Sequence, residues 1–156
     1  METIDKIEVD EEMLLEQYKL FVDSAHKVTE QRNSTNKFYI SLLSGIITAM
    51  ILFFEKIASD DYLEVILFVV GCLGTMLCYA WYSNIKAYKQ LNSAKFKVIH
   101  EMEQYLPISC FDREWEILGR GENKDKYLKL TSIEEKLPIL LAIPYILIGI
   151  IAIILA

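Results

Sequence analysis

The chain has 156 residues and a net charge of −6, with 53% hydrophobic and 24% charged residues. These averages hide a strong partition, because three runs contain no Asp, Glu, Lys or Arg: 38–54, 65–85 and 137–156. A soluble helix keeps one polar face, whereas a bilayer core of about 30 Å needs an apolar run of about 20 residues. The composition therefore excludes a soluble enzyme, a secreted disulfide scaffold and a disordered tail.

Basic residues near the span ends predict the orientation, since they gather on the cytosolic side. Residues 18–37 carry four Lys or Arg, the acidic loop 55–64 carries one, and residues 86–136 carry ten. We expect a cytosolic N-terminus, an external 55–64 loop, a cytosolic 86–136 segment and a C-terminus at the outer face. Residues 1–37 are mostly polar and acidic, unlike a signal peptide, so we expect the first span to stay in the membrane.

The first predicted element is a long helix that begins in the N-terminal segment 1–37. No Gly or Pro occurs between Met1 and Ser44, so this amphipathic helix is expected to continue into the first span, 38–54. Its apolar side recurs in alternating steps of four and three, the spacing of paired helices. This stripe consists of Leu14, Tyr18, Phe21, Ala25, Val28, Arg32 and Thr35.

The second span, 65–85, is expected to continue as one helix to Leu106, because Pro107 is the first clear stop. A near-heptad stripe follows this span: Ala87, Leu91, Ala94, Val98, Met102 and Tyr105. Both stripes would be exposed to water unless they met. We therefore predict an antiparallel helix hairpin formed by the cytosolic extensions of helices 1 and 2.

The rest of the chain leads to the third span. Residues 107–136 are predicted to be irregular, and we expect four apolar residues there to pack against the hairpin: Phe111, Trp115, Ile117 and Leu118. The third span is 137–156, and Pro144 inside it should kink the helix. The predicted fold class is an all-α polytopic membrane protein with three transmembrane helices.

Small residues form one face of the first span. Ser41, Gly45 and Ala49 are four residues apart, a spacing that lets helices approach closely. Ser44 and Thr48 lie beside them. One interpretation is tight helix packing, with the hydroxyls bonded to their own backbone; the other is a hydroxyl-lined pore at an oligomer axis. Gly71, Gly74 and Thr75 offer a second surface for close approach.

Four lysines follow the second span: Lys86, Lys89, Lys95 and Lys97. They could bind an anionic ligand or a lipid headgroup. Alternatively, they anchor the cytosolic end and pair with the acidic stripe of the N-terminal helix. That stripe consists of Glu16, Asp23 and Glu30, which recur seven residues apart.

Residues typical of catalysis or metal binding are sparse. His26 and His100, on predicted cytosolic helices, could join acidic neighbours in a metal site, although surface or packing roles are commoner. The cysteines, Cys72, Cys78 and Cys110, have no metal-site spacing and no disulfide framework. No nucleotide-binding or hydrolase motif appears, and no ionisable residue lies inside a span. We predict no enzyme activity, no cofactor and no metal, and the acidic balance argues against nucleic acid as a partner.

Several stretches together resemble the RipA family of small bacterial membrane proteins. The first is LNSAKFKVIHE at 91–101, followed by Leu106-Pro107; then come EWEILGRG at 114–121 and YLKLT at 127–131. The helix 18–37 also fits, so the resemblance covers about residues 15–145. The residues that carry it best are Leu91, Asn92, Lys95, Glu101, Trp115 and Gly119.

The resemblance implies a bacterial plasma-membrane protein that assembles as a homo-octamer, and it implies no catalytic residues. The layout alone is also similar to SLATT-type two-span modules of bacterial conflict systems. We expect a non-enzymatic scaffold or regulatory assembly whose partners are its own copies, membrane lipids and an unidentified cytosolic or membrane protein. The alternatives are a passive pore gated from the cytosol, serving stress response or phage defence, and a sensor of an anionic molecule at the four lysines.

Overall fold

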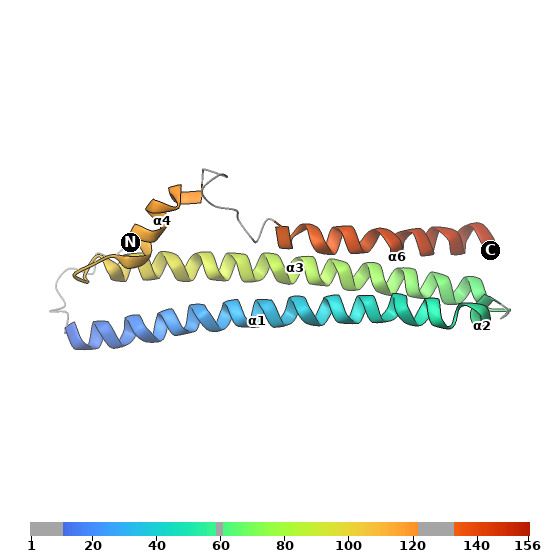
Figure 1. The fold of residues 1–156 in the computed structure, drawn as a ribbon, viewed down its shortest axis with the longest axis horizontal. Coiled ribbons are helices and arrows are strands. Elements are labelled where there is room, and N and C mark those ends of the chain that lie inside the picture. The colour runs from blue at the N-terminus through green and yellow to red at the C-terminus, as the bar shows by residue number, and fades with distance from the viewer. Residues whose placement is uncertain (1–10, 59–60, 122–132) are drawn as a thin grey trace, which may run out of the picture. The chain divides into compact units, whose positions relative to one another are not determined.

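The computed structural model describes residues 11–58, 61–121 and 133–156 (Figure 1). In these ranges every regular element is helical, and three helices are long and apolar enough to cross a membrane. This confirms the all-α membrane class. Three parts of the sequence predictions lie outside the described residues: the start of the N-terminal helix, the centre of the 55–64 loop, and residues 122–132 of the predicted irregular segment, which include the family-like stretch 127–131.

The three long helices are α1 (Glu11–Leu52), α3 (Leu63–Glu103) and α6 (Lys136–Leu155), and they contain the three candidate spans. At 1.5 Å per residue, the 42 residues of α1 extend about 63 Å, roughly twice the thickness of a bilayer core. The prediction of one helix that begins before the first span is confirmed. The helix α6 includes Pro144 within its length.

The shorter elements are α2 (Phe54–Ala58), α4 (Cys110–Ile117) and the 3-10 turn η1 (Gly119–Gly121). The prediction of irregular structure is wrong at α4, and α3 ends at Glu103 rather than at Leu106. Beyond Glu103 the chain tightens, with the Leu106 amide donating to the Glu103 carbonyl at 3.1 Å. The Glu103 carboxylate then accepts hydrogen bonds from the first amides of α4 and so caps this helix. The sequence near α4 does not predict this cap.

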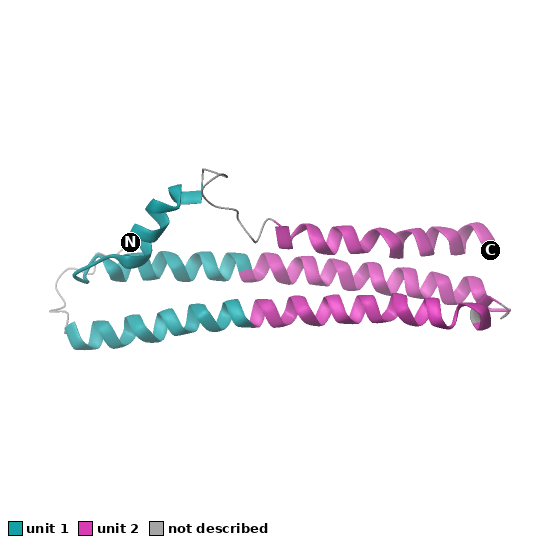
Figure 2. Ribbon diagram, viewed as in Figure 1, with its two compact units in different colours: residues 1–30, 89–129 teal, residues 31–88, 130–156 magenta. Residues whose placement is uncertain are grey.

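The chain forms two compact units, and α1 and α3 each contribute to both (Figure 2). Unit 1 consists of residues 1–30 and 89–129, and unit 2 consists of residues 31–88 and 130–156.

The core of unit 2 combines apolar packing with satisfied polar groups. Leu43, Trp81 and Tyr145 are fully buried in it. The Tyr145 hydroxyl donates to the Leu43 carbonyl at 2.5 Å, and the Trp81 indole N–H donates to Asn36 Oδ1 at 2.8 Å. The Tyr39 ring stacks on Trp81, with 5.9 Å between centroids. Since a membrane interior offers no water, these internal partners satisfy groups that would otherwise be costly to bury.

In unit 1 two polar contacts join α1 to α3. The Tyr18 hydroxyl donates to Glu103 Oε1 at 3.0 Å, and Lys95 Nζ donates to Ser24 Oγ at 2.6 Å. The apolar residues buried in this unit are Ala25, Val28 and Ile99.

The stripe predicted for α3 is wrong as the surface that meets α1. Leu91 and Val98 are exposed at 47% and 38%, and Ala87 and Ala94 are exposed as well. The residues that contact α1 or are buried are instead Lys95, Ile99 and Glu103, which occupy a neighbouring face. Apolar periodicity missed this face because two of its three members are charged. Ile117 is also 69% exposed, so its expected packing is wrong, whereas the Phe111 ring does pack against Phe96.

Candidate functional site

The small-residue face of the first span is exposed in the structure. We call it the small face; it consists of Ser41, Ser44, Gly45, Thr48 and Ala49, every one of them exposed. A Cβ atom added at Gly45 would meet nothing within 4 Å. The Thr48 hydroxyl donates to the Ser44 carbonyl at 2.8 Å, so this polar group is already satisfied within the helix.

The small face is exposed because the other side of α1 supplies the core of unit 2. Leu43 is fully buried there, and its carbonyl accepts the bond from Tyr145. The side chains beside it, Ile46 and Ile47, are partly buried against the same core. Within the subunit, therefore, α1 uses its bulky face for packing and presents its small face outward. A second helix could approach the small face closely, because little side-chain volume stands in its way.

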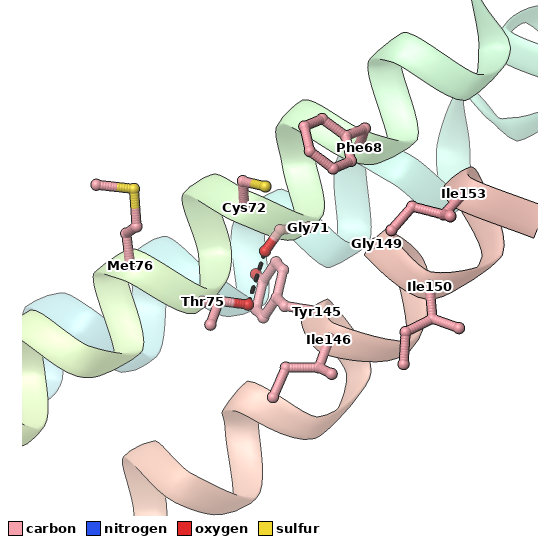
Figure 3. Close-up of a pocket in the computed structure, with 10 residues that line it drawn as sticks. All are labelled: Phe68, Gly71, Cys72, Thr75, Met76, Tyr145, Ile146, Gly149, Ile150 and Ile153. Carbon is pink, nitrogen blue, oxygen red and sulfur yellow. Dashed lines mark hydrogen bonds between the residues drawn. The ribbon is translucent and has the colours of Figure 1, made fainter. Parts of the chain in front are cut away.

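Glycines give the second span a close contact with α6, as their sequence positions suggested (Figure 3). A Cβ at Gly71 would lie 2.7 Å from the Gly149 amide nitrogen, so the two backbones nearly touch. A Cβ at Gly74 would lie 1.9 Å from the Tyr145 ring, which occupies the space that a side chain would fill. The Thr75 hydroxyl donates to the Gly71 carbonyl at 2.8 Å. These glycines serve packing within the subunit.

A shallow apolar groove of about 390 Å³ runs beside this contact. It opens between α3 and α6, and Figure 3 shows its side chains. Thr75 contributes the one hydroxyl besides that of Tyr145, and no charged group lines it. Such a surface suits acyl chains or another apolar helix rather than a polar substrate. The lining residues are Phe68, Gly71, Cys72, Thr75, Met76, Tyr145, Ile146, Gly149, Ile150 and Ile153.

Glu103 is the polar centre of unit 1 and is fully buried. Its carboxylate accepts the amides of Phe111 at 2.8 Å and Asp112 at 3.0 Å, together with the Tyr18 hydroxyl. A carboxylate at the start of a helix satisfies free N–H groups and complements the helix dipole. Burial, and next the hydrogen bond to Glu103, raise the pKa of Tyr18 to about 12. Glu103 thus holds α1, α3 and the start of α4 together.

The four lysines do not converge on one site. Lys95 points toward α1, where it bonds Ser24 and lies 4.9 Å from the centre of the Phe21 ring. Lys97, two positions later and so about 200° round the helix, is exposed. Lys86 belongs to unit 2 and lies 4.8 Å from the centre of the Tyr82 ring, and Lys89 is exposed in unit 1. The hydrogen bond of Lys86 to Tyr82 raises its pKa.

An ion pair in unit 2 joins α1 to the segment just before α6. Arg32 Nε lies 3.5 Å from Glu134 Oε2, and the two side chains are only 12% and 11% exposed. Neither of these two atoms has a hydrogen-bond partner among the described residues. Arg32 belonged to the predicted stripe, but its acidic partner, about 100 residues away, could not be found from spacing.

The family-like residues fall into two groups. On α3, Leu91 and Glu101 are exposed, while Asn92 is half-buried with an unbonded side-chain oxygen. Beyond α4, Gly119 has φ 68° and begins a left-handed run with Arg120 (φ 51°) and Gly121 (φ 71°). Glycine tolerates this conformation, so Gly119 has a backbone role. Trp115 on α4 is half-buried.

The residues able to bind a metal are scattered. Across the described part of the chain, no three His, Cys, Asp or Glu side chains gather as metal ligands would. His26 Nε2 lies 3.4 Å from Glu30 on the α1 surface, and the His100 ring packs edge-on against Phe96. The three cysteines are free thiols.

Sequence reasoning located the small face and the glycine contact but missed Glu103, Glu134 and Tyr145. A glutamate on a charged helix, such as Glu103, is expected at the surface. A tyrosine in an apolar run, such as Tyr145, is expected to serve only apolar packing. The one available signal was Pro107, which ends the long helix and forces a new helix start close to Glu103.

Comparison with known proteins gives the family. Neither a curated protein nor a solved structure matches the chain. The sequence model of the octameric membrane protein family (8xMP) matches residues 15–154, which include all of α3 and nearly all of α1 and α6. The chain therefore belongs to the octameric membrane protein family.

Proposed function

We propose that this protein is a non-enzymatic membrane scaffold, a homo-octamer whose subunits contact one another through the small face of α1. The observation that carries the proposal is the exposure of all five small-face residues on a subunit of an octameric family. Lipid tails are as apolar as a helix surface, so spans associate through close packing rather than through a hydrophobic gain. Small residues allow that approach, and the bond from Thr48 to the Ser44 carbonyl lowers the cost of covering a hydroxyl.

The orientation and relatives of the scaffold form part of the same proposal. The lysine and arginine counts support a cytosolic N-terminus and a cytosolic 86–136 segment. The resemblance to the RipA family supports a bacterial plasma membrane. The extensions of the first two spans then form a cytosolic helix hairpin. The motifs around Leu91 and Trp115 support a RipA-like member of the family. Membrane lipids and a protein that docks on the cytosolic side are its further partners.

A passive pore is the second candidate function. Its support is that three hydroxyl residues, Ser41, Ser44 and Thr48, lie exposed on one side of a candidate span. If this side faced the axis of the octamer, the hydroxyls would line a water-filled path. The cytosolic helices would then gate the path, in a stress response or a phage defence.

Binding of lipid headgroups is a third candidate function, carried by the lysines that follow the second span. Lys86 and Lys89 are exposed near the predicted cytosolic end of the second span, where basic side chains attract anionic lipids. Lys95 is already engaged with Ser24, so a site for a soluble ligand has less support than headgroup contact.

One experiment separates scaffold from pore. Purified protein is reconstituted in sealed liposomes, ion and dye flux is recorded, and subunit number is measured by native mass spectrometry. The scaffold predicts intact octamers in tight liposomes. It also predicts that Ser44→Leu, which adds bulk to the small face, lowers the subunit number. The matched control is Ile143→Phe, which enlarges a half-exposed side chain on α6.

The pore predicts a different pattern. Wild-type octamers would conduct, and Ser44→Leu or Thr48→Leu would abolish the flux while the octamer persisted. Wild-type conduction with this pattern would overturn the scaffold in favour of the pore. A chain that stays monomeric would contradict both.

A further inference from the structure

Part of α3 outside the apolar run presents an uncovered apolar stripe. Leu91, Ala94 and Val98 follow one another in steps of three and four, and all three are exposed in unit 1. This spacing places them along one helix face, the pattern of a helix that pairs with another. The α1 helix already packs on the neighbouring face, through Lys95 and Glu103. We call the three exposed residues the α3 seam.

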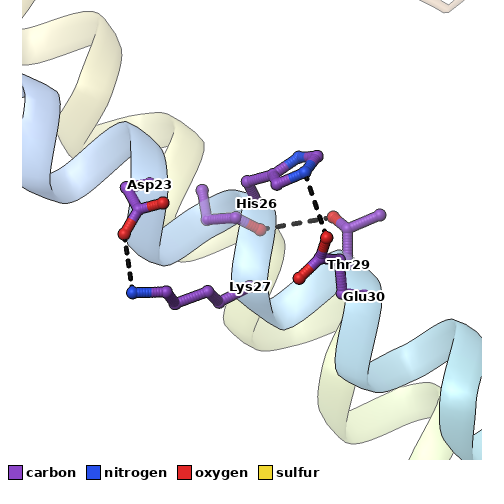
Figure 4. Close-up of polar contacts among 6 residues, drawn as sticks. Asp23, His26, Lys27, Thr29 and Glu30 are labelled. Atoms are coloured by element: carbon purple, nitrogen blue, oxygen red, sulfur yellow. Dashed lines mark hydrogen bonds and ion pairs between the residues drawn. The ribbon is translucent and has the colours of Figure 1, made fainter.

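The outer face of α1 in unit 1 has complementary features. Leu20 is 69% exposed there, and the exposed charges Lys19 and Asp23 flank it. Asp23 pairs with Lys27 of the same helix, with 2.7 Å between the charged atoms, as Figure 4 shows. Both side chains of that pair are more than half exposed, so water screens their attraction and Asp23 can exchange Lys27 for another cation. The hydrogen bond to Asp23 raises the pKa of Lys27.

The register of unit 1 aligns opposite charges. Tyr18 lies beside Glu103, and Ser24 lies beside Lys95, so the α1 and α3 segments run in opposite directions. Asp23 is one residue from Ser24, and Lys97 is two residues from Lys95. Asp23 and Lys97 therefore lie at nearly the same height along the helix axes. Lys19 and Glu101 match in the same way, close to the level of Tyr18 and Glu103. Lys97 and Glu101 are both exposed and lie beside the α3 seam.

A closed ring of identical subunits preserves such a match. Rotation about a ring axis changes no residue's height, and each contact joins two different faces of the subunit. We propose that in the octamer the α3 seam of one subunit packs on Leu20 of the next. Lys97 then pairs with the neighbour's Asp23 across the interface, and Glu101 pairs with the neighbour's Lys19. This inference rests on the proposed octamer and names a second contact, outside the spans, in addition to the small face.

Cysteine cross-linking tests the seam directly. Leu20→Cys and Val98→Cys are introduced together into a chain whose own cysteines are replaced by Cys72→Ser, Cys78→Ala and Cys110→Ser. Membranes are treated with copper phenanthroline as oxidant, and products are separated without reductant. Native mass spectrometry of the unoxidised protein gives the subunit number in parallel. We expect a ladder of covalent oligomers for the double variant, since facing side chains allow the short Cα separation that a disulfide requires.

The single variants are the matched controls. Neither Leu20→Cys nor Val98→Cys alone should form dimers, because the proposed contact joins two different faces. Dimers from either single variant would overturn the seam, since they would show a like-with-like contact. An intact octamer with no ladder from the double variant would overturn the seam and leave the proposed function standing. A chain that forms no octamer before oxidation would overturn both.

Charge exchange gives an independent readout. Lys97→Glu should reduce the fraction of octamer at low ionic strength, and Lys97→Glu with Asp23→Lys should restore it. Arg113→Glu is the control, because this exposed α4 residue makes the same charge change away from the seam. If Lys97→Glu leaves the octamer fraction unchanged, or if Arg113→Glu lowers it equally, the proposed charge pairing is wrong.

Discussion

The two compact units share the long helices α1 and α3, but the contacts that stabilise each unit differ in chemistry. In unit 2 the contacts depend on missing side chains and aromatic rings, as at Gly71, Gly74 and Tyr145. In unit 1 they depend on a buried carboxylate and a lysine, Glu103 and Lys95. Unit 2 therefore depends on the close approach of α6 to α3, whereas unit 1 depends on polar partners between α1, α3 and α4.

The difference follows from the surroundings that the sequence predicts for each unit. Where lipid replaces water, apolar burial gains little, and close approach with internal hydrogen bonds must stabilise the contact. Where water is present, polar side chains can be buried if each finds a partner, as Glu103 does with three donors. A substitution should therefore act through packing in unit 2 and through lost polar partners in unit 1. One exception, the Arg32–Glu134 pair, gives unit 2 a charged contact of its own.

The largest effect should come from removing one partner of the Arg32–Glu134 ion pair. Glu134→Ala leaves the Arg32 charge nearly buried without its acidic partner, which should cost about 3–5 kcal/mol of unfolding free energy. The measurement is the unfolding midpoint in detergent micelles. Arg32→Met with Glu134→Leu is the control, because an apolar pair of similar volume removes both charges and should recover most of the loss. If the double variant is as unstable as Glu134→Ala, charge burial is not the cause.

Filling the glycine contact should have the next largest effect. Gly74→Leu places a side chain where the Tyr145 ring lies, and overpacking of this kind costs about 1–3 kcal/mol or more. The readout is again the unfolding midpoint, measured on isolated subunits in detergent. Gly45→Leu is the matched control, because a Cβ there meets nothing and subunit stability should hardly change. Equal losses in the two variants would contradict the packing described for unit 2.

Removing the carboxylate of unit 1 should loosen α4 in particular. Glu103→Leu leaves the Phe111 and Asp112 amides and the Tyr18 hydroxyl without their acceptor, and each unsatisfied buried group costs about 1–3 kcal/mol. Relative to the wild type, the Glu103→Leu variant should show a larger increase in hydrogen-exchange rate in residues 110–117 than in the α3–α6 contact. The control is Glu101→Leu, at an exposed position on the same helix. Unchanged protection of α4 in Glu103→Leu would show that the cap is dispensable.

The smallest effect concerns alkaline pH. The pKa of Tyr18 is raised to about 12 in the folded chain, above the ordinary value of 10.0. A raised tyrosine pKa means that folding favours the neutral form, so this stabilisation is full below pH 10 and is lost as pH rises through 12. Tyr18→Phe should remove one late-titrating tyrosine from the absorbance titration near 295 nm. A wild-type titration without a tyrosine above the ordinary range would contradict this assignment.

The membrane class was predictable from the sequence because helices in water need a polar face, which long uncharged runs cannot supply. The three spans, the continuity of α1 and the close approach at Gly71 and Gly74 follow from composition, the absence of breakers and small-residue spacing. The small face was also visible, because five small residues on one helix side are a local pattern. Its exposure required the structure, since it depends on which side of α1 meets the Tyr145 region.

The parts that failed are those in which polar groups decide the packing. An apolar stripe predicted that Leu91 and Val98 face α1, whereas Lys95 and Glu103 hold that position. The α4 helix was predicted to be irregular because its cap is supplied by Glu103, outside the helix itself. Partners of this kind are brought together by the fold, and spacing along the chain does not reveal them.

If the small face of α1 joins the subunits, adding a bulky side chain to it should lower the number of subunits in the assembly. Native mass spectrometry is applied to wild-type protein, to Gly45→Leu and to the α6 control Ile143→Phe, all extracted in the same mild detergent. We expect octamers for the wild type and for Ile143→Phe, and smaller species for Gly45→Leu although its subunit remains folded. Octamers of undiminished stability in Gly45→Leu would contradict it.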